Sequence, residues 1–372
     1  MTELYATEVG TARYRARFDG LVADGHFRRQ RGLWLSSIGL GTYLGEADEA
    51  TDARYHDAVV HAVQLGCNVI DSAINYRFQR SERAIGQALR TLFSQGQAKR
   101  DELIISTKGG YIPFDGAPPP DLRRYFQETF FDTGIITPSD LAGGGWHCLA
   151  PAYLQHQLEA SRRNLGLACI DIYYLHNPEQ QLGDVSRDEF HTRMRAAFEL
   201  LEQCVNEGKI RLYGTATWNG YRQPPTAPDF LSLDQLLKIA RDVAGVDHHF
   251  RVIQLPYNLG MTEAFGWRNQ PCNGDFCSTL ELAARHGMIV MASASILQGR
   301  LTRQLPADLQ RALPSLETDA QRAIQFVRST PGVTTALVGM SRVAHVQENL
   351  RTAQVAPAPL EDFMKLFVEE SE

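Results

Sequence analysis

Four residues whose side chains could together donate a proton lie at or just after the ends of three short apolar runs. Asp71, Lys108 and His176 each close a run, and Tyr76 lies on the segment that follows Asp71. Polar residues at the ends of successive parallel strands meet on one face, and in an α/β barrel that face carries the chemistry. A carboxylate, a phenol, an ammonium and an imidazole gathered there predict a proton-donating cluster.

The elements that must position this cluster follow a regular alternation from about Ser36 onward. Short β-branched or apolar runs alternate with longer stretches of helical period, and a glycine such as Gly66 or Gly208 often follows the helical stretch as a C-cap. Strands are expected near residues 36–43, 67–73, 102–109, 170–177, 210–218, 250–258, 288–296 and 333–340. Eight βα units favour an α/β fold, a closed (β/α)8 TIM barrel, over an open doubly wound sheet.

Two segments lie outside these eight units. The segment from Arg13 to Leu35 contains the turn-like pairs Asp19-Gly20 and Asp24-Gly25, so we expect strands forming a β-hairpin that covers the N-terminal mouth of the barrel. With no linker or change in composition, residues 1–372 are expected to form a single domain, with the barrel proper at about residues 36–353.

The second segment is a long insertion after the third strand, between Lys108 and Pro151. Its length of about 40 residues far exceeds an ordinary βα loop, and loops at this end of a barrel commonly close over active sites. We therefore expect it to contribute aromatic side chains to a substrate pocket. The candidates are Tyr111, Phe114, Tyr125, Phe130 and Trp146.

Composition narrows the possible partners and location. The chain has 372 residues, 44% of them hydrophobic, and a formal net charge of −6, which argues against a nucleic-acid partner. The basic run Arg28 to Arg31 is interpreted as a solvated hairpin face. Dispersed cysteines, no secretory signal and no apolar run of membrane-spanning length predict a cytoplasmic protein with no membrane partner. Nothing in the sequence indicates an oligomeric state.

Two further motifs suggest functions that their spacing does not support. Gly39-Leu40-Gly41-Thr42-Tyr43-Leu44-Gly45 is glycine-rich and follows a strand, but the third glycine is one residue late for a dinucleotide-binding Rossmann turn and no helix opens on it. His248-His249 and His147-Cys148 lack further ligands at zinc spacing, so no metal site is predicted.

Taken together, the motifs resemble the aldo-keto reductase family of (β/α)8 oxidoreductases. The resemblance runs in order across almost the whole chain from Ser36. It rests on Gly39 to Tyr43, Asp71 to Tyr76 with Ser81-Glu82, Ser106 to Lys108, Asp171 to His176, Gly214 to Trp218, Gln254 and Asn258, Gln298-Gly299, Gly339 to Ser341, and Glu348-Asn349.

This resemblance implies a catalytic tetrad and an NADPH-dependent reduction of an aldehyde or ketone. Tyr76 would be the general acid, Lys108 and Asp71 would tune it, and His176 would orient the small-molecule carbonyl substrate. The residue chemistry agrees, because a nearby ammonium favours ionisation of a phenol whose ordinary pKa is about 10. Substrate-pocket residues would be Tyr43, Tyr111, Trp146 and Trp218.

The resemblance also implies a nicotinamide site and a phosphate site. The residues expected to bind the cofactor are Gly41, Thr42, Asp71, Thr217, Gln254, Ser293, Gln298, Gly299, Ser341, Arg342, His345, Glu348 and Asn349. The last five open the final helix, where free N–H groups favour an anion. Arg342 favours NADPH over NADH, because the additional phosphate rewards a cation.

Several departures from the family pattern keep other interpretations open. Arg77-Phe78-Gln79-Arg80 replaces the glycine that commonly follows the tyrosine, and Ala216-Thr217 and Ser293 stand where the family often has other nicotinamide contacts. One alternative is therefore an NADPH-binding redox sensor or regulatory subunit with little turnover. Another is a barrel aldolase that uses Lys108 as a Schiff-base nucleophile, which the neighbouring Asp71 argues against.

Overall fold

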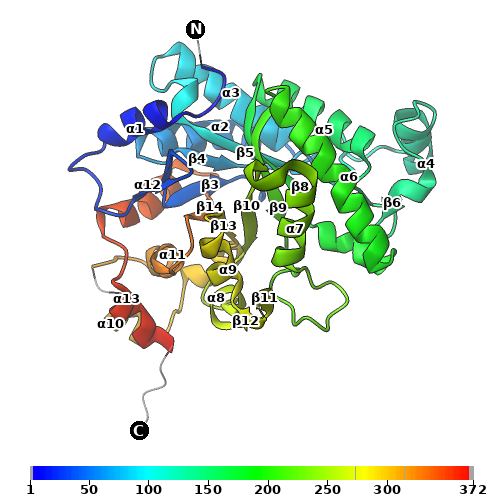
Figure 1. Cartoon of the computed structure of the whole chain (residues 1–372). Coiled ribbons are helices and arrows are strands. Elements are labelled where there is room, and N and C mark those ends of the chain that lie inside the picture. The colour runs from blue at the N-terminus through cyan, green and yellow to red at the C-terminus, as the bar shows by residue number, and fades with distance from the viewer. Residues whose placement is uncertain (1–2, 273, 314, 368–372) are drawn as a thin grey trace.

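Eight parallel strands form a closed barrel in the computed structural model, which describes residues 3–272, 274–313 and 315–367 (Figure 1). Each predicted strand contains one observed strand, so the predicted (β/α)8 fold is confirmed. Around the barrel the order is β10-β13-β14-β3-β4-β5-β8-β9. The strands are β3 (Ile38–Gly41), β4 (Val69–Asp71), β5 (Ile104–Gly109), β8 (Ile170–His176), β9 (Ile210–Ala216), β10 (Phe250–Pro256), β13 (Ile289–Ser293) and β14 (Thr335–Gly339).

Helices connect successive strands and surround the barrel (Figure 1). They are α2 (Glu49–Gln64), α3 (Arg80–Ser94), α5 (Pro151–Leu165), α6 (Arg187–Asn206), α7 (Leu233–Ala244), α9 (Thr279–Arg285), α11 (Asp319–Ser329) and α12 (Val343–Leu350). Local sequence explains their limits. Asp48 and Ser186 cap the first turns of α2 and α6 through side-chain oxygens, and Gly166 ends α5 in the left-handed conformation.

The barrel closes through the pairing of β14 with β3. Ala336 pairs with Ile38 and Gly339 with Gly41, and the Thr335 hydroxyl donates to the Ser36 carbonyl over 2.8 Å. Parallel strands throughout the barrel place all eight carboxyl ends on one face.

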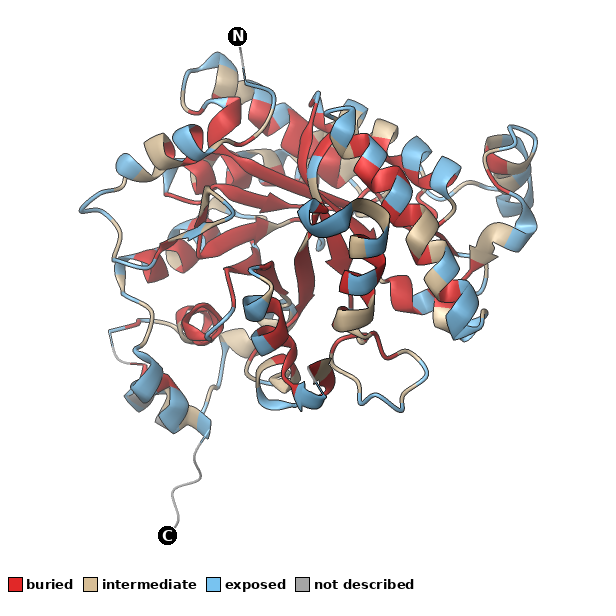
Figure 2. Ribbon diagram, in the orientation of Figure 1, coloured by how far each residue is buried: buried red, intermediate tan, exposed pale blue. Residues whose placement is uncertain are grey.

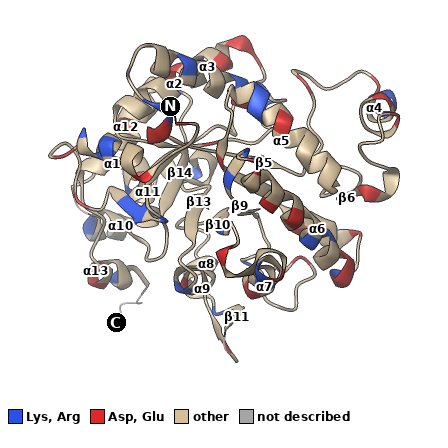
Figure 3. Cartoon of the chain, turned by 45° about the horizontal axis from the view of Figure 1, so that its top comes forward, with Lys and Arg blue, Asp and Glu red and all other residues tan. Residues whose placement is uncertain are grey.

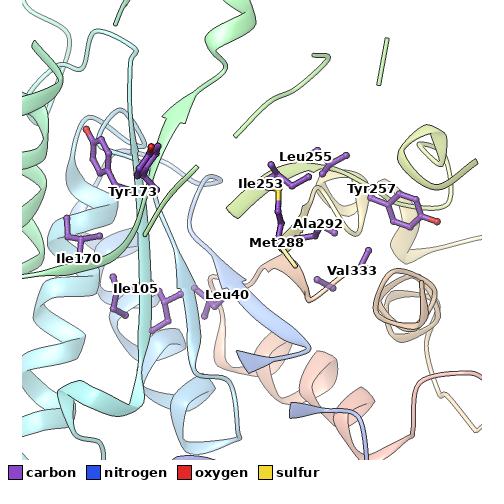
Figure 4. Close-up of a cluster of buried hydrophobic side chains, with 14 of the residues drawn as sticks. Leu40, Ile105, Ile170, Tyr173, Ile253, Leu255, Tyr257, Met288, Ala292 and Val333 are labelled. Atoms are coloured by element: carbon purple, nitrogen blue, oxygen red, sulfur yellow. The ribbon is translucent and has the colours of Figure 1, made fainter. Parts of the chain in front are cut away.

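The core has two layers, one inside the barrel and one between the barrel and its helices. Val69, Ile104 and Ile172 belong to the inner cluster, whereas side chains such as Ile105 and Ile253 belong to the outer one (Figure 4). Both strand faces are therefore covered, which explains the near-continuous apolar runs of the sequence. Figure 2 shows buried strands surrounded by helices whose outer faces are exposed.

The N-terminal segment forms one helix and a hairpin. The hairpin pairs β1 (Phe27–Gln30) with β2 (Leu33–Ser36), as expected, but its turn lies at Arg31-Gly32. The expectation of strands from Arg13 is wrong, because α1 (Glu8–Ala16) occupies that region and begins at the N-cap Thr7. Leu33 and Leu35 pack on the inner cluster, so the hairpin covers the N-terminal mouth of the barrel.

The basic run on this hairpin is only partly solvated. Arg29 and Arg31 are exposed, whereas the Arg28 guanidinium donates to backbone carbonyls of Arg328 and Val333, and burial lowers the pKa of Arg28 to about 10. The interpretation of a wholly solvated face is therefore wrong at Arg28. Elsewhere Lys and Arg are interspersed with Asp and Glu over the helices (Figure 3).

The insertion between β5 and α5 folds around its own small cluster, in which Ile112, Phe130, Ile136, Cys148 and Tyr153 are buried. Its elements are α4 (Leu122–Phe126), the π-helical turn η2 (Gln127–Phe131), the 3-10 turn η3 (Pro138–Asp140), β6 (Leu141–Ala142) and β7 (His147–Cys148). In Figure 1, α4 lies away from the barrel, at the edge of the molecule.

Shorter elements complete the chain, and no helix in the described ranges is both long and apolar enough to cross a membrane. The remaining helices and strands are η1 (Arg100–Glu102), η4 (Pro178–Gly183), η5 (Gly245–Asp247), α8 (Glu263–Gly266), β11 (Gln270–Cys272), β12 (Asp275–Cys277), η6 (Leu297–Thr302), α10 (Ala307–Ala312), η7 (Arg351–Gln354), α13 (Leu360–Met364) and η8 (Lys365–Phe367).

Candidate active site

A cavity of about 410 Å³ opens at the carboxyl ends of the strands. Its lining comes from segments that follow most of the barrel strands, as expected where parallel strand ends converge. The predicted residues that line it are Gly41, Thr42, Tyr43, Asp71, Tyr76, Tyr111, His176, Thr217, Trp218, Gln254, Ser293 and Gln298.

Lys108 and Asp71 form a buried ion pair beneath this cavity. The Lys108 ammonium donates to Asp71 Oδ2 and to the Ser72 carbonyl, both over 2.6 Å, and its side chain is 1% exposed. Burial alone would lower the pKa of Lys108, but attraction to Asp71 and Tyr76 outweighs it and raises that pKa. Lys108 is therefore a fixed positive charge at neutral pH.

The second oxygen of Asp71 is also fully engaged. Asp71 Oδ1 accepts from the Ser106 hydroxyl over 2.8 Å and from Gln254 Nε2 over 2.9 Å. Because both carboxylate oxygens have donors, the orientation of Asp71 toward Lys108 is fixed by strands β5 and β10.

Tyr76 lies between this ion pair and the cavity. The Lys108 nitrogen is 4.8 Å from the centroid of the Tyr76 ring, and the rings of Tyr43 and His176 approach at 5.0 and 5.8 Å, edge to face. Burial raises the pKa of the Tyr76 phenol and the Lys108 ammonium opposes that rise. The phenol is consequently protonated at neutral pH, and the ammonium is placed to stabilise the phenolate that remains after proton transfer.

His176 is held as a neutral imidazole on the facing wall. Burial, then the nearby positive charge of Lys108, lower the pKa of His176 well below its usual value. Nδ1 is buried without a hydrogen-bond partner in the described part of the chain, which leaves Nε2 as the ring nitrogen toward the cavity. The ring of Tyr111 packs against His176 edge to face at 4.9 Å. A neutral imidazole with an unprotonated Nδ1 can donate from Nε2.

The remaining predicted cofactor residues lie outside the cavity. Ser341, Arg342, His345, Glu348 and Asn349 surround the start and body of α12, and Gly299 lies on the exposed turn η6 next to Gln298. These residues form a group distinct from the tetrad. Asn349 Oδ1 there and Thr217 Oγ1 at the cavity are buried atoms without a hydrogen-bond partner in the described ranges.

Four of the five aromatic residues predicted from the insertion do not line the cavity, namely Phe114, Tyr125, Phe130 and Trp146. Trp146 is 41% exposed and packs on Phe114 and Phe126 of the insertion. Phe130 is enclosed in the cluster of the insertion. Of the insertion aromatics, Tyr111 alone is among the cavity-lining residues, because the others cover one another.

Two asparagines that line the cavity, Asn75 and Asn177, were not predicted as site residues. Asn75 precedes Tyr76 and has a buried Oδ1 with no hydrogen-bond partner among the residues that the structure describes. Asn177 follows His176 and has a left-handed φ of 45°. The Asn177 amide donates to the Tyr111 hydroxyl over 3.0 Å. Their only signal in the sequence is adjacency to two tetrad residues, which does not say whether an amide faces the cavity.

Comparisons with known proteins identify the family that this chain resembles. Residues 37–227 match the model of the aldo/keto reductase family. The Schizosaccharomyces pombe protein named aldo-keto reductase yakc [NADP(+)] is 27% identical over 49% of this chain and 41% of its own length. A putative voltage-gated potassium channel subunit beta from the same organism is 21% identical over 88% of this chain and 87% of its length.

Solved structures show the same fold. A Klebsiella pneumoniae aldo/keto reductase in complex with NADP and acetate superposes with a TM-score of 0.61 and 20% identity, covering 94% of this chain and 98% of that one. The family model spans a little over half of the chain, and the strand ends carry the sequence motifs that resemble this family. The chain therefore belongs to the aldo/keto reductase family.

Proposed function

We propose that this protein reduces an aldehyde or ketone to an alcohol with NADPH, with Tyr76 as the general acid. The observation that carries the proposal is the contact of the Tyr76 phenol with the buried Lys108–Asp71 pair at the edge of the cavity. A phenol beside a fixed ammonium, with a neutral imidazole opposite, is suited to proton transfer onto a carbonyl oxygen.

The described residues fit a nicotinamide cofactor. Thr217 Oγ1 at the cavity and Asn349 Oδ1 on α12 are buried polar atoms that a bound cofactor could pair. Gln254, Ser293 and Gln298 line the cavity beside Thr217. Arg342 is exposed at the N-cap of α12, where it suits the additional phosphate of NADPH more than NADH. The relatives that carry NADP in their names or structures support the same choice.

The residues of the chain divide the work of the reaction. When bound, NADPH would supply the hydride. Tyr76 donates its proton to the carbonyl oxygen, and Lys108 stabilises the resulting phenolate. Asp71 keeps Lys108 charged and oriented, and His176 Nε2 donates a hydrogen bond that holds the carbonyl oxygen near the phenol.

Replacing Tyr76 with Phe tests this proposal, because it keeps the ring and removes the acid. We expect NADPH affinity, measured by fluorescence titration, to stay within about threefold, while carbonyl turnover falls by on the order of 10² to 10⁴. Tyr125→Phe is the matched control, since it removes a phenol that donates to the Pro113 carbonyl within the insertion. Undiminished turnover of the Tyr76 variant on an accepted substrate would exclude Tyr76 as the acid.

A regulatory, slowly turning protein is the second candidate. The extended match to a protein named as a channel beta subunit motivates it. Mixing the NADPH complex with a panel of carbonyls in a single-turnover experiment separates the two. Oxidation within seconds supports a reductase, whereas tight NADPH binding with no oxidation by any member of the panel supports a sensor.

The geometry disfavours an aldolase. Schiff-base formation needs an unprotonated amine, but the Lys108 nitrogen is engaged by Asp71 and Ser72 and its pKa is raised. Borohydride treatment with a carbonyl substrate should therefore leave Lys108 unmodified, as judged by peptide mass mapping.

A further inference from the structure

We propose that Arg77 is a positioning residue for the reduction, which holds Tyr76 against the loop after β3 and so fixes the phenol over Lys108. This inference rests on the proposed function of Tyr76. Arg77 directly follows Tyr76, and its side chain is 2% exposed.

The backbone after Tyr76 has an unusual conformation. Arg77, Phe78 and Gln79 have φ values of 50°, 57° and 70°, so three successive residues with side chains are left-handed. This region costs free energy for residues that carry a β-carbon, and it persists only where surrounding contacts enforce it. The contacts of this segment must therefore hold it in place.

The Arg77 guanidinium supplies such contacts on one side. Nε donates to the Glu46 carbonyl over 2.8 Å, and Nη2 donates to the Asp48 carbonyl over 3.2 Å and pairs with the Asp52 carboxylate. The guanidinium also lies 5.3 Å from the centroid of the Tyr55 ring. All four partners belong to the loop after β3 or to α2, so one side chain joins the Tyr76 segment to that loop.

That loop forms part of the cavity wall. Tyr43 and Leu44 line the cavity, and the Tyr43 ring packs edge to face on Tyr76 at 5.0 Å. Tyr55, whose ring lies beside the guanidinium, donates its hydroxyl to the Leu44 carbonyl over 2.6 Å. Arg77 therefore connects the acid to the neighbouring wall of the cavity through both backbone and aromatic contacts.

The other side of the segment is held by the insertion and α5. The Phe78 carbonyl accepts from the Gly116 N–H over 2.9 Å, and Gln79 Nε2 donates to the Phe114 carbonyl over 3.0 Å. Gln79 Oε1 accepts from Asn164 over 3.0 Å. Arg77 binds the segment to the β3 loop, and these hydrogen bonds bind it to the insertion and α5. The segment is therefore fixed on two sides.

Arg80 offers a matched control. Its guanidinium pairs with the same Asp52 carboxylate over 2.6 Å, and Arg80 has no described contact with Glu46, Asp48 or Tyr55. Arg77→Ala and Arg80→Ala therefore remove one cation each from Asp52, but only the first releases the β3 loop.

We expect Arg77→Ala to lower kcat about 10- to 100-fold while NADPH affinity stays within about threefold, and Arg80→Ala to change kcat less than about threefold. If Arg77 acts through Tyr76, adding Arg77→Ala to Tyr76→Phe should cause less than about threefold further loss. Arg77→Lys keeps a charge for Asp52 without the fork that reaches two carbonyls, so its kcat should lie between those of the wild type and Arg77→Ala.

Each outcome decides the matter. Equal kcat values for the Arg77 and Arg80 variants, or losses that multiply fully in the double variant, would overturn the positioning role while leaving Tyr76 as the acid. Full activity of Tyr76→Phe would instead overturn the proposed function itself. If Arg77→Ala fails to fold, as judged by circular dichroism, Arg77→Lys carries the test, and its wild-type kcat would overturn the inference.

Discussion

At the scale of single residues, His147 supports the site without lining the cavity. Its Nε2 donates to the backbone carbonyl of His176 over 2.7 Å, and its Nδ1 accepts from the Gln181 amide over 2.8 Å. These two bonds fix one neutral tautomer. Burial, only partly offset by the bond to His176, lowers the pKa of His147 to about 4.

A depressed histidine pKa has a definite sign in the pH dependence of stability. His147 stays neutral in the folded protein down to about pH 4, whereas the unfolded chain takes up a proton below about pH 6.5. The contribution of neutral His147 to the unfolding free energy is therefore fully present above about pH 6.5. About 3 kcal/mol of it is lost as the pH falls from about 6.5 to about 4.

We expect His147→Gln to reduce the slope of the unfolding free energy against pH between pH 6.5 and 4. The reduction should correspond to about one fewer proton taken up on unfolding. Urea titrations at several pH values measure this slope. His26, whose pKa burial lowers to about 3, contributes a second proton, so its replacement in the same background should flatten the slope again. An unchanged slope in His147→Gln would show that His147 is not protonated on unfolding in this range.

The gathering of the four proposed tetrad residues was predictable from the sequence, but the side chains that support them were not. Asp71, Lys108 and His176 end apolar runs, which is a local signal. Arg77 and His147 matter through bonds to residues 25 or more positions away, and no local pattern marks them. Left-handed backbone at residues 77–79 was likewise hidden, because glycine, its usual signal, is absent there.

At the scale of elements, a buried carboxylate joins the loops after β8 and β9. Glu179 Oε1, in η4, accepts from the backbone N–H groups of Trp218, Asn219 and Gly220 over 2.7, 3.0 and 3.3 Å. Trp218 lines the cavity, so this acceptor fixes the backbone that carries the indole ring. Strand ends fix the tetrad, whereas side chains such as Glu179 fix the loops around it.

We expect Glu179→Ala to raise KM for the carbonyl substrate about tenfold, with kcat within about threefold, because three N–H groups lose their acceptor and Trp218 loses its fixed position. Steady-state kinetics would measure KM and kcat, and thermal denaturation should show a lowered melting temperature for this variant. Glu263→Gln is the control, since it weakens an ion pair to Arg222 on the same loop and spares the N–H groups of 218–220. If Glu179→Ala and Glu263→Gln had the same KM, substrate binding by Trp218 would not depend on Glu179.

Element types were predictable except where tertiary contacts decided. The turn-like glycines near residues 20 and 25 favoured a hairpin that starts at Arg13. Arg13 instead lies in helix α1, and its side chain pairs with Asp101 and Glu102. In the insertion, aromatic residues alone could not show which would face the cavity, because Phe130 and Trp146 pack on insertion neighbours.

At the scale of the whole molecule, we propose that the chain folds as one domain. The half of the barrel from β3 to β9 and the half from β10 to β14 pair with each other at both of their edges. The family match ends at residue 227, between β9 and β10. A chain cut there would leave β9 without β10 and β3 without β14.

We therefore expect a fragment of residues 1–227 to show no cooperative thermal transition by circular dichroism and to bind a hydrophobic dye, because two strand edges and the inner cluster would be exposed. The full chain under the same conditions is the reference. A sharp melting transition of a monomeric fragment would contradict the single-domain proposal.

The Thr335–Ser36 bond joins positions 299 residues apart, and this separation bears on how the protein is made. On a ribosome, β3 emerges early and must wait for β14 before the cylinder can close. Its unsatisfied edge stays open to chaperones or to another nascent chain for nearly the whole period of translation. Expression at lower temperature, or with more chaperone, should accordingly raise the yield of native protein more than any change at the mouth of the cavity.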